Sequence, residues 1–169
     1  MKSPAPALLL VVLAVSVFNG AVFAAEPING FRGLRWGDPV SSIPNARKTQ
    51  SLAIGEHCYE RPDDTLTMGK ATLSDIRYCF YKNRFSSLII TFPSERDGDA
   101  IRLALIEAYG VPNQPHPDLK HHYRWRTSKA EAILEYRPEG GAFIANSEAL
   151  LRERKNEIKS SAKNHSPDR

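Results

Sequence analysis

The sequence predicts an α+β domain in which an antiparallel β-sheet built from hairpins is covered on one face by an amphipathic helix. Two observations support this fold class. Residues 73–81 and 85–92 are strand-like runs on either side of the turn Lys82-Asn83-Arg84, which is typical of a β-hairpin. Apolar residues then recur at helical spacing over about 95–109, and three further strand-like runs and a C-terminal helix follow.

The composition is that of an ordinary globular protein. Of the 169 residues, 41% are hydrophobic and 25% are charged. These values exclude wholesale disorder, and the length suits one domain of ordinary size. The formal net charge of +4 permits anionic partners without requiring them.

The first 24 residues have the three zones of a secretory signal peptide. Lys2 supplies a positive charge, residues 8–18 form an apolar run of 11 residues, and Val22-Phe23-Ala24 offers residues that signal peptidase tolerates. This run is too short to span a bilayer, which needs about 20 apolar residues. A retained membrane anchor is the alternative. We expect cleavage after Ala24 and a periplasmic or secreted mature protein without a transmembrane segment.

Cys58 and Cys79 are the only cysteines in the chain. Export would place them in an oxidising compartment. Their separation of 21 residues fits neither a metal-ligand spacing nor a Cys-x-x-Cys redox motif. The sequence therefore predicts a structural disulfide between them.

The elements before the hairpin are short. Asp38 and Pro39 predict a helical turn over residues 40–43, and a first extended stretch is expected over residues 52–59. Within the hairpin, Leu88, Ile90 and Phe92 share one face of their strand. Ile89 lies on the other face, which indicates a strand near the centre of the sheet.

The helix over about 95–109 has a clear start and a clear end. Ser94 and Asp97 resemble a capping box, and Gly110 occupies the position of a left-handed C-terminal cap. Arg102 is expected on the outer face. The buried face is expected to comprise Ile101, Leu103, Ala104, Leu105, Ile106 and Ala108.

Strand-like runs at residues 121–127, 130–136 and 142–145 complete the predicted sheet, with turns between them. Ser147 can cap a last helix that runs through Ile158. The single domain is therefore expected over residues 25–159, followed by a disordered tail over residues 160–169.

Four short motifs are spread over most of residues 28–147. They are F-x-G-L-x-W-G at 31–37, Y-x-R-P-D-D at 59–64, F-Y-K-N-R-F at 80–85 and Y-G-V-P at 109–112. This set resembles a group of small exported bacterial proteins of uncharacterised function. The resemblance implies a periplasmic α+β domain. Because the motifs are turns, core aromatics and a helix end, it implies no catalytic residues.

The motifs of common enzyme classes are missing from the sequence. There is no Gly-x-Ser-x-Gly elbow, no phosphate-binding loop and no dinucleotide fingerprint. Asp63 and Asp64 are adjacent acids, but they lie in a turn next to Pro62 and are expected to be solvated. We predict no catalytic residue and no cofactor. A small secreted hydrolase with an unrecognised site is the alternative.

Histidines raise the question of a metal site. His116, His121 and His122 fall within seven residues, and His57 precedes Cys58. Adjacent residues on a strand point to opposite faces, so His121 and His122 are poor joint ligands. We expect a surface patch and no metal site.

Residues 120–126, with the sequence Lys-His-His-Tyr-Arg-Trp-Arg, contain no acid and alternate at strand period. His122, Arg124 and Arg126 share one face, opposite Tyr123 and Trp125. The basic face is either a solvated surface or an anion-binding ridge for a polymer, a lipid head group or an acidic protein. Export removes the usual nucleic-acid target, so the expected partner is a protein or an anionic ligand of the cell envelope. The sequence thus favours a non-catalytic binding or accessory module.

Overall fold

In this computed structural model the described residues are 28–52, 55–115 and 119–164. The predicted signal peptide, residues 165–169 of the predicted tail, and His116 lie outside these ranges.

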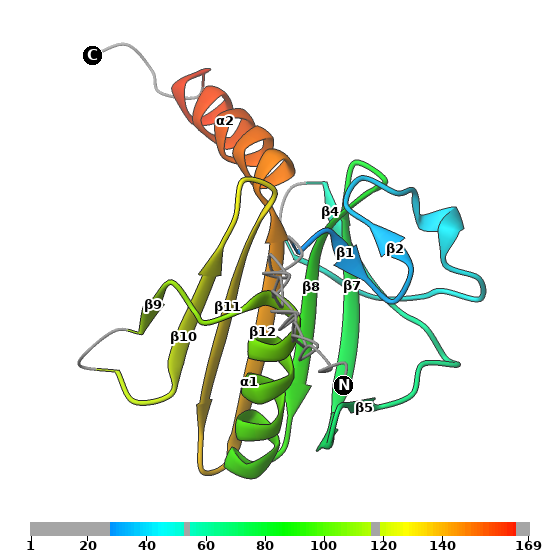
Figure 1. Cartoon of the computed structure of the whole chain (residues 1–169). Helices are drawn as coiled ribbons and strands as arrows, with labels where there is room; N and C mark the ends of the chain where they lie inside the picture. Colours follow the sequence, from blue (N-terminus) through cyan, green and yellow to red (C-terminus); the bar gives the residue numbers. More distant parts are fainter. Residues whose placement is uncertain (1–27, 53–54, 116–118, 165–169) are drawn as a thin grey trace, which may run out of the picture.

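An eight-stranded antiparallel sheet forms the body of the described chain, in the order β3-β4-β7-β8-β12-β11-β10-β9 (Figure 1). Two four-stranded meanders meet where β8 pairs with β12. The strands are β3 Arg47–Ser51, β4 Glu56–Glu60, β7 Asp75–Tyr81, β8 Arg84–Phe92, β9 Gln114–Pro115, β10 His122–Arg126, β11 Ala130–Arg137 and β12 Gly140–Ser147. The predicted sheet built from hairpins is confirmed, with β8 near its centre.

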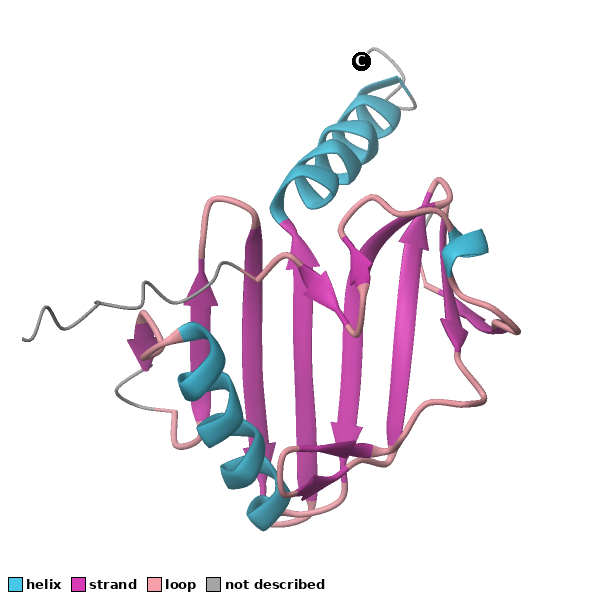
Figure 2. Ribbon diagram, turned by 45° about the vertical axis from the view of Figure 1, so that its right-hand side comes forward, coloured by secondary structure: helices cyan, strands magenta, loops and turns pink. Residues whose placement is uncertain are grey.

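The remaining elements are two helices and three short pieces. The short pieces are the hairpin β1 Gly30–Phe31 with β2 Leu34–Arg35, the 3-10 turn Val40–Ser42, and the hairpin β5 Thr67–Met68 with β6 Ala71–Thr72. Helix α1, Glu95–Tyr109, crosses one face of the sheet over β11 and β12, and helix α2, Glu148–Asn164, projects beyond the end of the sheet (Figure 2). Within the described ranges, neither helix combines the length and the hydrophobicity that a membrane span requires.

The start and the end of α1 follow the sequence signals. The Ser94 hydroxyl accepts a hydrogen bond from the Asp97 backbone N–H at 3.2 Å, and Gly110 has φ +80°. Ile101 and Leu105 are fully buried against the sheet, as predicted. The prediction that Leu103 and Ala108 are buried is wrong, because Leu103 is 60% exposed and Ala108 is also exposed. At about 100° per residue, position 103 lies on the side of the helix opposite positions 101 and 105.

Arg102, which was expected on the outer face of the helix, is only 30% exposed. Its guanidinium lies over the Tyr123 ring, 5.5 Å from the ring centre, and its Nε is 3.7 Å from an Asp99 carboxylate oxygen. The side chain therefore covers part of the aromatic core.

The core lies between α1 and the face of the sheet that carries the aromatic residues. Tyr136 is at its centre, where its hydroxyl donates a hydrogen bond to Asp99 at 2.8 Å. Burial and this hydrogen bond raise the pKa of Tyr136. Gly98 lets the helix backbone approach the Tyr136 ring, because a Cβ at this position would lie 2.5 Å from it. The two short hairpins add Phe31 and Met68 to the same face, and Trp36, which follows the first hairpin, also packs there.

Helix α2 continues further than the sequence predicted. It begins after Ser147, whose hydroxyl accepts a hydrogen bond from the Leu150 N–H at 3.5 Å, and it runs to Asn164. Residues 160–164, predicted as the start of a disordered tail, are helical. Their polar composition misled the prediction, although they contain neither glycine nor proline and the first helix breaker is Pro167.

The structure confirms the predicted disulfide. Cys58 on β4 and Cys79 on β7 are direct partners in the register of the two strands, and both are fully buried. The bridge therefore links β4 to the hairpin of β7 and β8 in the middle of the first meander.

Replacing both Cys58 and Cys79 by Ser should lower the free energy of unfolding by about 3 kcal/mol, because the bridge closes a loop of this size in the unfolded chain. Urea unfolding of the two proteins measures the difference. Thiol labelling of the unfolded, unreduced wild type should find no free thiol, and two labelled cysteines per chain would show that the bridge does not form.

Candidate anion-binding site

A cleft of about 680 Å³ opens where β10, the turn after it and the start of α2 meet. This volume is within the range of small-ligand sites. Three arginines line it, two from β10 and one from α2, and we call it the arginine cleft. Its lining residues are Asn113, Arg124, Arg126, Thr127, Ser128, Glu148 and Arg152.

Strand alternation on β10 positions the first two arginines. Tyr123 stacks on Tyr136, and Trp125 is 2% exposed and donates its indole N–H to the Gly110 carbonyl at 2.8 Å. These contacts anchor one side of the strand in the core. Arg124 and Arg126 therefore point to the other face of the sheet, together with His122.

The structure adds a feature that the sequence of β10 did not reveal: each basic side chain has an acid beside it. His122 Nδ1 is 3.6 Å from Glu135, and Arg124 Nε is 3.6 Å from Glu131. Arg126 contacts Glu148 at 4.0 Å. The basic face is therefore partly neutralised rather than an uncompensated positive ridge.

Glu148, the acid that lines the cleft, lies deeper than the two guanidinium groups beside it. The side chain of Glu148 is 21% exposed, compared with 61% for Arg126 and 70% for Arg152. Glu148 is 3.7 Å from Arg152 and 4.0 Å from Arg126, so it sits between them at distances longer than a hydrogen bond. Glu148 can thus hold the two guanidinium groups close together while their N–H donors face the solvent.

The charge balance at the cleft is positive. Arg124, Arg126 and Arg152 carry three positive charges, and Glu131 and Glu148 carry two negative ones. Several outward N–H donors with one excess positive charge suit a phosphate, sulfate or carboxylate group, which accepts paired hydrogen bonds from arginine.

Sequence reasoning identified Arg124 and Arg126 but missed Arg152, Glu148 and Asn113. A sequence signal for Glu131 and Glu135 was present. Counting outward from the turn at residues 128–129 pairs Arg126 with Glu131 and His122 with Glu135. Arg152 lies in a charged stretch of α2, and its place beside β10 depends on how that helix leaves the sheet. No local pattern marks it.

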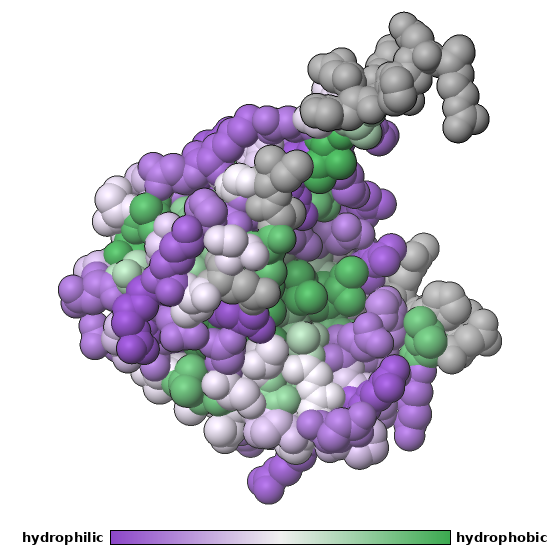
Figure 3. Space-filling view, turned by 180° about the vertical axis from the view of Figure 1, so that it is seen from behind, coloured by the Kyte–Doolittle hydropathy of each residue, from purple (hydrophilic) through white to green (hydrophobic). Residues whose placement is uncertain are grey.

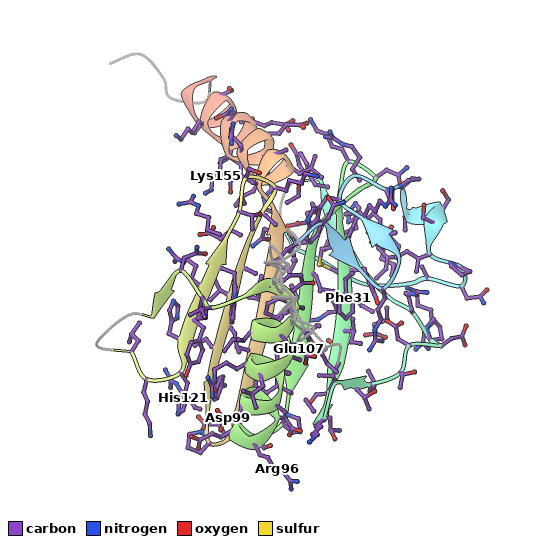
Figure 4. The ribbon with its side chains drawn as sticks, in the orientation of Figure 1. Phe31, Arg96, Asp99, Glu107, His121 and Lys155 are labelled. Atoms are coloured by element: carbon purple, nitrogen blue, oxygen red, sulfur yellow. A yellow bond between two sulfur atoms is a disulfide. The ribbon has the colours of Figure 1, made fainter. Side chains whose placement is uncertain are left out.

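The histidines lie on different sides of the sheet. The His121 ring stacks on Tyr136 on the core face, and its Nε2 is 2.9 Å from Glu95 near the start of α1, where Asp99 also lies (Figure 4). His122 lies on the opposite face, as predicted. His57 contacts the Ser51 hydroxyl at 2.9 Å. Within the described residues, no three His, Cys, Asp or Glu side chains are grouped as metal ligands.

Asp63 and Asp64 were both expected to be solvated, and this prediction is wrong for Asp64. Its carboxylate accepts a hydrogen bond from the Tyr78 hydroxyl at 2.6 Å and forms ion pairs with Arg32 and Arg61. Burial, followed by this hydrogen bond, raises the pKa of Tyr78. Asp64 thus holds the segment after β4 against the core, and its partners leave it poorly placed to act as a general acid or base.

No protein-family model, no curated protein and no solved structure matches this chain. The resemblance to small exported bacterial proteins therefore stays a prediction from the four motifs, and the function has to be inferred from the geometry of the site.

Proposed function

We propose that the protein is a non-catalytic binding module of the periplasm or the extracellular space, and that it holds an anionic group of its partner in the arginine cleft. The observation that carries this proposal is the arrangement of Arg124, Arg126 and Arg152 around one cleft, in which Arg126 and Arg152 are largely exposed and Glu148 lies between them. Buried, paired acids elsewhere, such as Asp64, favour binding over hydrolysis.

The proposed binding mode follows from the exposure of these groups. In the free protein the guanidinium groups are hydrated, and exposed ion pairs of this kind contribute at most about 1 kcal/mol to folding. A bound anion would replace that water and accept paired hydrogen bonds from groups that Glu148 already holds near one another. The predicted signal peptide and the disulfide are consistent with a partner in an oxidising compartment.

The double variant Arg124→Ala/Arg126→Ala should stay folded and should bind small anions at least about tenfold more weakly, since hydrogen bonds to charged groups are worth about 1.5–3 kcal/mol each. The probes are pyrophosphate and citrate, titrated while the arginine Nε–H signals are followed by NMR. We expect shifts at Arg124, Arg126 and Arg152, and weaker binding as the salt concentration rises.

The matched control is Arg47→Ala/Arg137→Ala, which removes two exposed arginines outside the cleft. It should bind both probes like the wild type. If the folded Arg124→Ala/Arg126→Ala protein keeps the wild-type affinity, or if the control loses as much, the arginine cleft is not the binding site. If the double variant loses affinity and the control does not, a pull-down from periplasmic extract with the wild type and the double variant would identify the natural partner.

A further inference from the structure

The sheet has a second face that the described chain covers only at one end. Helix α1 and the two short hairpins lie on the aromatic face. On the opposite face, α2 reaches over the end near β4, where Arg154 donates a hydrogen bond to Glu56. Figure 3 views this opposite face and shows hydrophobic side chains gathered in its middle, with polar residues around them. We call it the open face.

The hydrophobic centre of the open face is a row of three isoleucines. Ile89 on β8, Ile144 on β12 and Ile133 on β11 are successive partners in the strand register. Arg77 on β7 pairs with Ile89, and Arg124 on β10 pairs with Ile133. Ile144, at the middle of the row, is 37% exposed. An apolar centre with a polar rim is the anatomy of a protein interface.

This row reads the same from both ends: Arg, Ile, Ile, Ile, Arg. A two-fold axis parallel to β12 would therefore set the row on its counterpart in a second copy of the chain. Ile144 would meet Ile144 of the second copy, and Ile89 would meet Ile133 of the second copy. Self-complementary surfaces of this kind form isologous dimers, and facing sheets pack with their strands nearly aligned.

The charges on the open face also fit a second copy. Arg77 lies 2.7 Å from Asp75, and Arg124 lies 3.6 Å from Glu131, so each end of the row carries one arginine and one acid. Under this axis Arg77 faces Arg124 of the second copy, and each arginine keeps its own acid beside it, so the two facing ends are neutral overall.

We infer that the open face is the interface of a weak homodimer, in which the isoleucine rows of two copies pack together. Three open-face positions on each of five strands measure about 24 Å by 20 Å, given the usual strand and residue spacings. Cys79 and Ser87, at one corner, are already buried, which leaves about 420 Å² per copy. This area is at the lower end for specific complexes. We therefore expect a dimer that dissociates on dilution. The inference goes beyond the proposed function, because the three isoleucines lie outside the arginine cleft and only Arg124 belongs both to the row and to the cleft.

Sedimentation velocity of the purified protein between about 5 μM and 500 μM should show a monomer–dimer equilibrium, the range expected for a weak complex. Ile144→Glu should remain monomeric throughout, because it places a charge against its own counterpart. Leu103→Glu is the matched control: it makes the same kind of change at a residue that is 60% exposed on α1, and it should dimerise like the wild type. A wild type that is monomeric at every concentration, or equal loss in both variants, overturns the inference.

Cross-linking tests the orientation of the two copies. With a short bis-maleimide, Ile144→Cys should cross-link to itself, and Leu103→Cys should not. A mixture of Ile89→Cys and Ile133→Cys should cross-link more than either variant alone, because the two positions meet only across the two-fold axis. If Ile89→Cys links to itself as well as the mixture does, this two-fold arrangement is wrong.

Discussion

Replacing Arg154 by Met should lower the free energy of unfolding by about 3–5 kcal/mol, because it leaves a buried carboxylate without its charge partner. That carboxylate belongs to Glu56 on β4, which is 2% exposed. Arg154 donates a hydrogen bond to one of its oxygens, and the hydroxyls of Ser86 and Ser87 donate to the other at 3.1 and 3.3 Å. The two neutral hydroxyls would remain in the variant, but they do not replace a guanidinium.

Urea unfolding of Arg154→Met and Lys155→Met measures this contribution with a matched control. Lys155 is an exposed base on the same helix (Figure 4), so its replacement should change stability by less than about 0.5 kcal/mol. The double variant Glu56→Gln/Arg154→Met should recover part of the loss, because the buried group is then neutral. Equal stability of the two single variants would mean that Glu56 does not depend on Arg154.

The same contact has a consequence for the arginine cleft. Glu148 and Arg152 reach the cleft from the first turns of α2. Arg154, on the same helix, binds Glu56 on β4, which lies in the other half of the sheet from β10. The position of α2 therefore links a buried ion pair to the proposed binding site. A loss of this anchor should disturb the spacing between Arg152 and Arg126 even though neither residue is changed.

The parts of the fold that the sequence predicted well carry strong local signals. The hairpin of β7 and β8 has alternating residues and a turn in which Lys82 and Asn83 both have positive φ. Helix α1 has its capping serine and its terminal glycine. Such features depend on neighbours within a few residues, so one sequence is enough to find them.

Edge strands and long-range contacts escaped prediction for a physical reason. β3 is polar, Arg47 to Ser51, and lies at the edge of the sheet, where exposed strands are typically short and charged. It therefore has no hydrophobic alternation to detect. The arginine cleft combines residues 113, 124, 126–128, 148 and 152, and the isoleucine row combines three strands. The row depends on the register between β8, β12 and β11, and the cleft depends on where α2 leaves the sheet relative to β10, which only the folded chain defines.

Leu105→Ala should lower the free energy of unfolding by about 2–5 kcal/mol, whereas Leu103→Ala should change it by less than about 0.5 kcal/mol. The two substitutions remove the same atoms from the same helix. Leu105 is fully buried between α1 and the sheet, and Leu103 is 60% exposed. The first change leaves a cavity beside Ile101 in the core, because the aromatic residues around it are fixed by stacking and by the hydrogen bond from Tyr136 to Asp99.

Thermal and urea unfolding of the two variants separate this core packing from helix propensity, since Leu→Ala changes propensity equally at both positions. The comparison also tests which side of α1 faces the sheet. If Leu103→Ala destabilised the protein as much as Leu105→Ala, the helix would be rotated by about half a turn from its place over β11 and β12. In the arrangement described, Gly98→Ala should destabilise the protein, because its Cβ would collide with the Tyr136 ring. In the rotated helix this collision would be absent, and Gly98→Ala would stabilise the protein by about 1 kcal/mol.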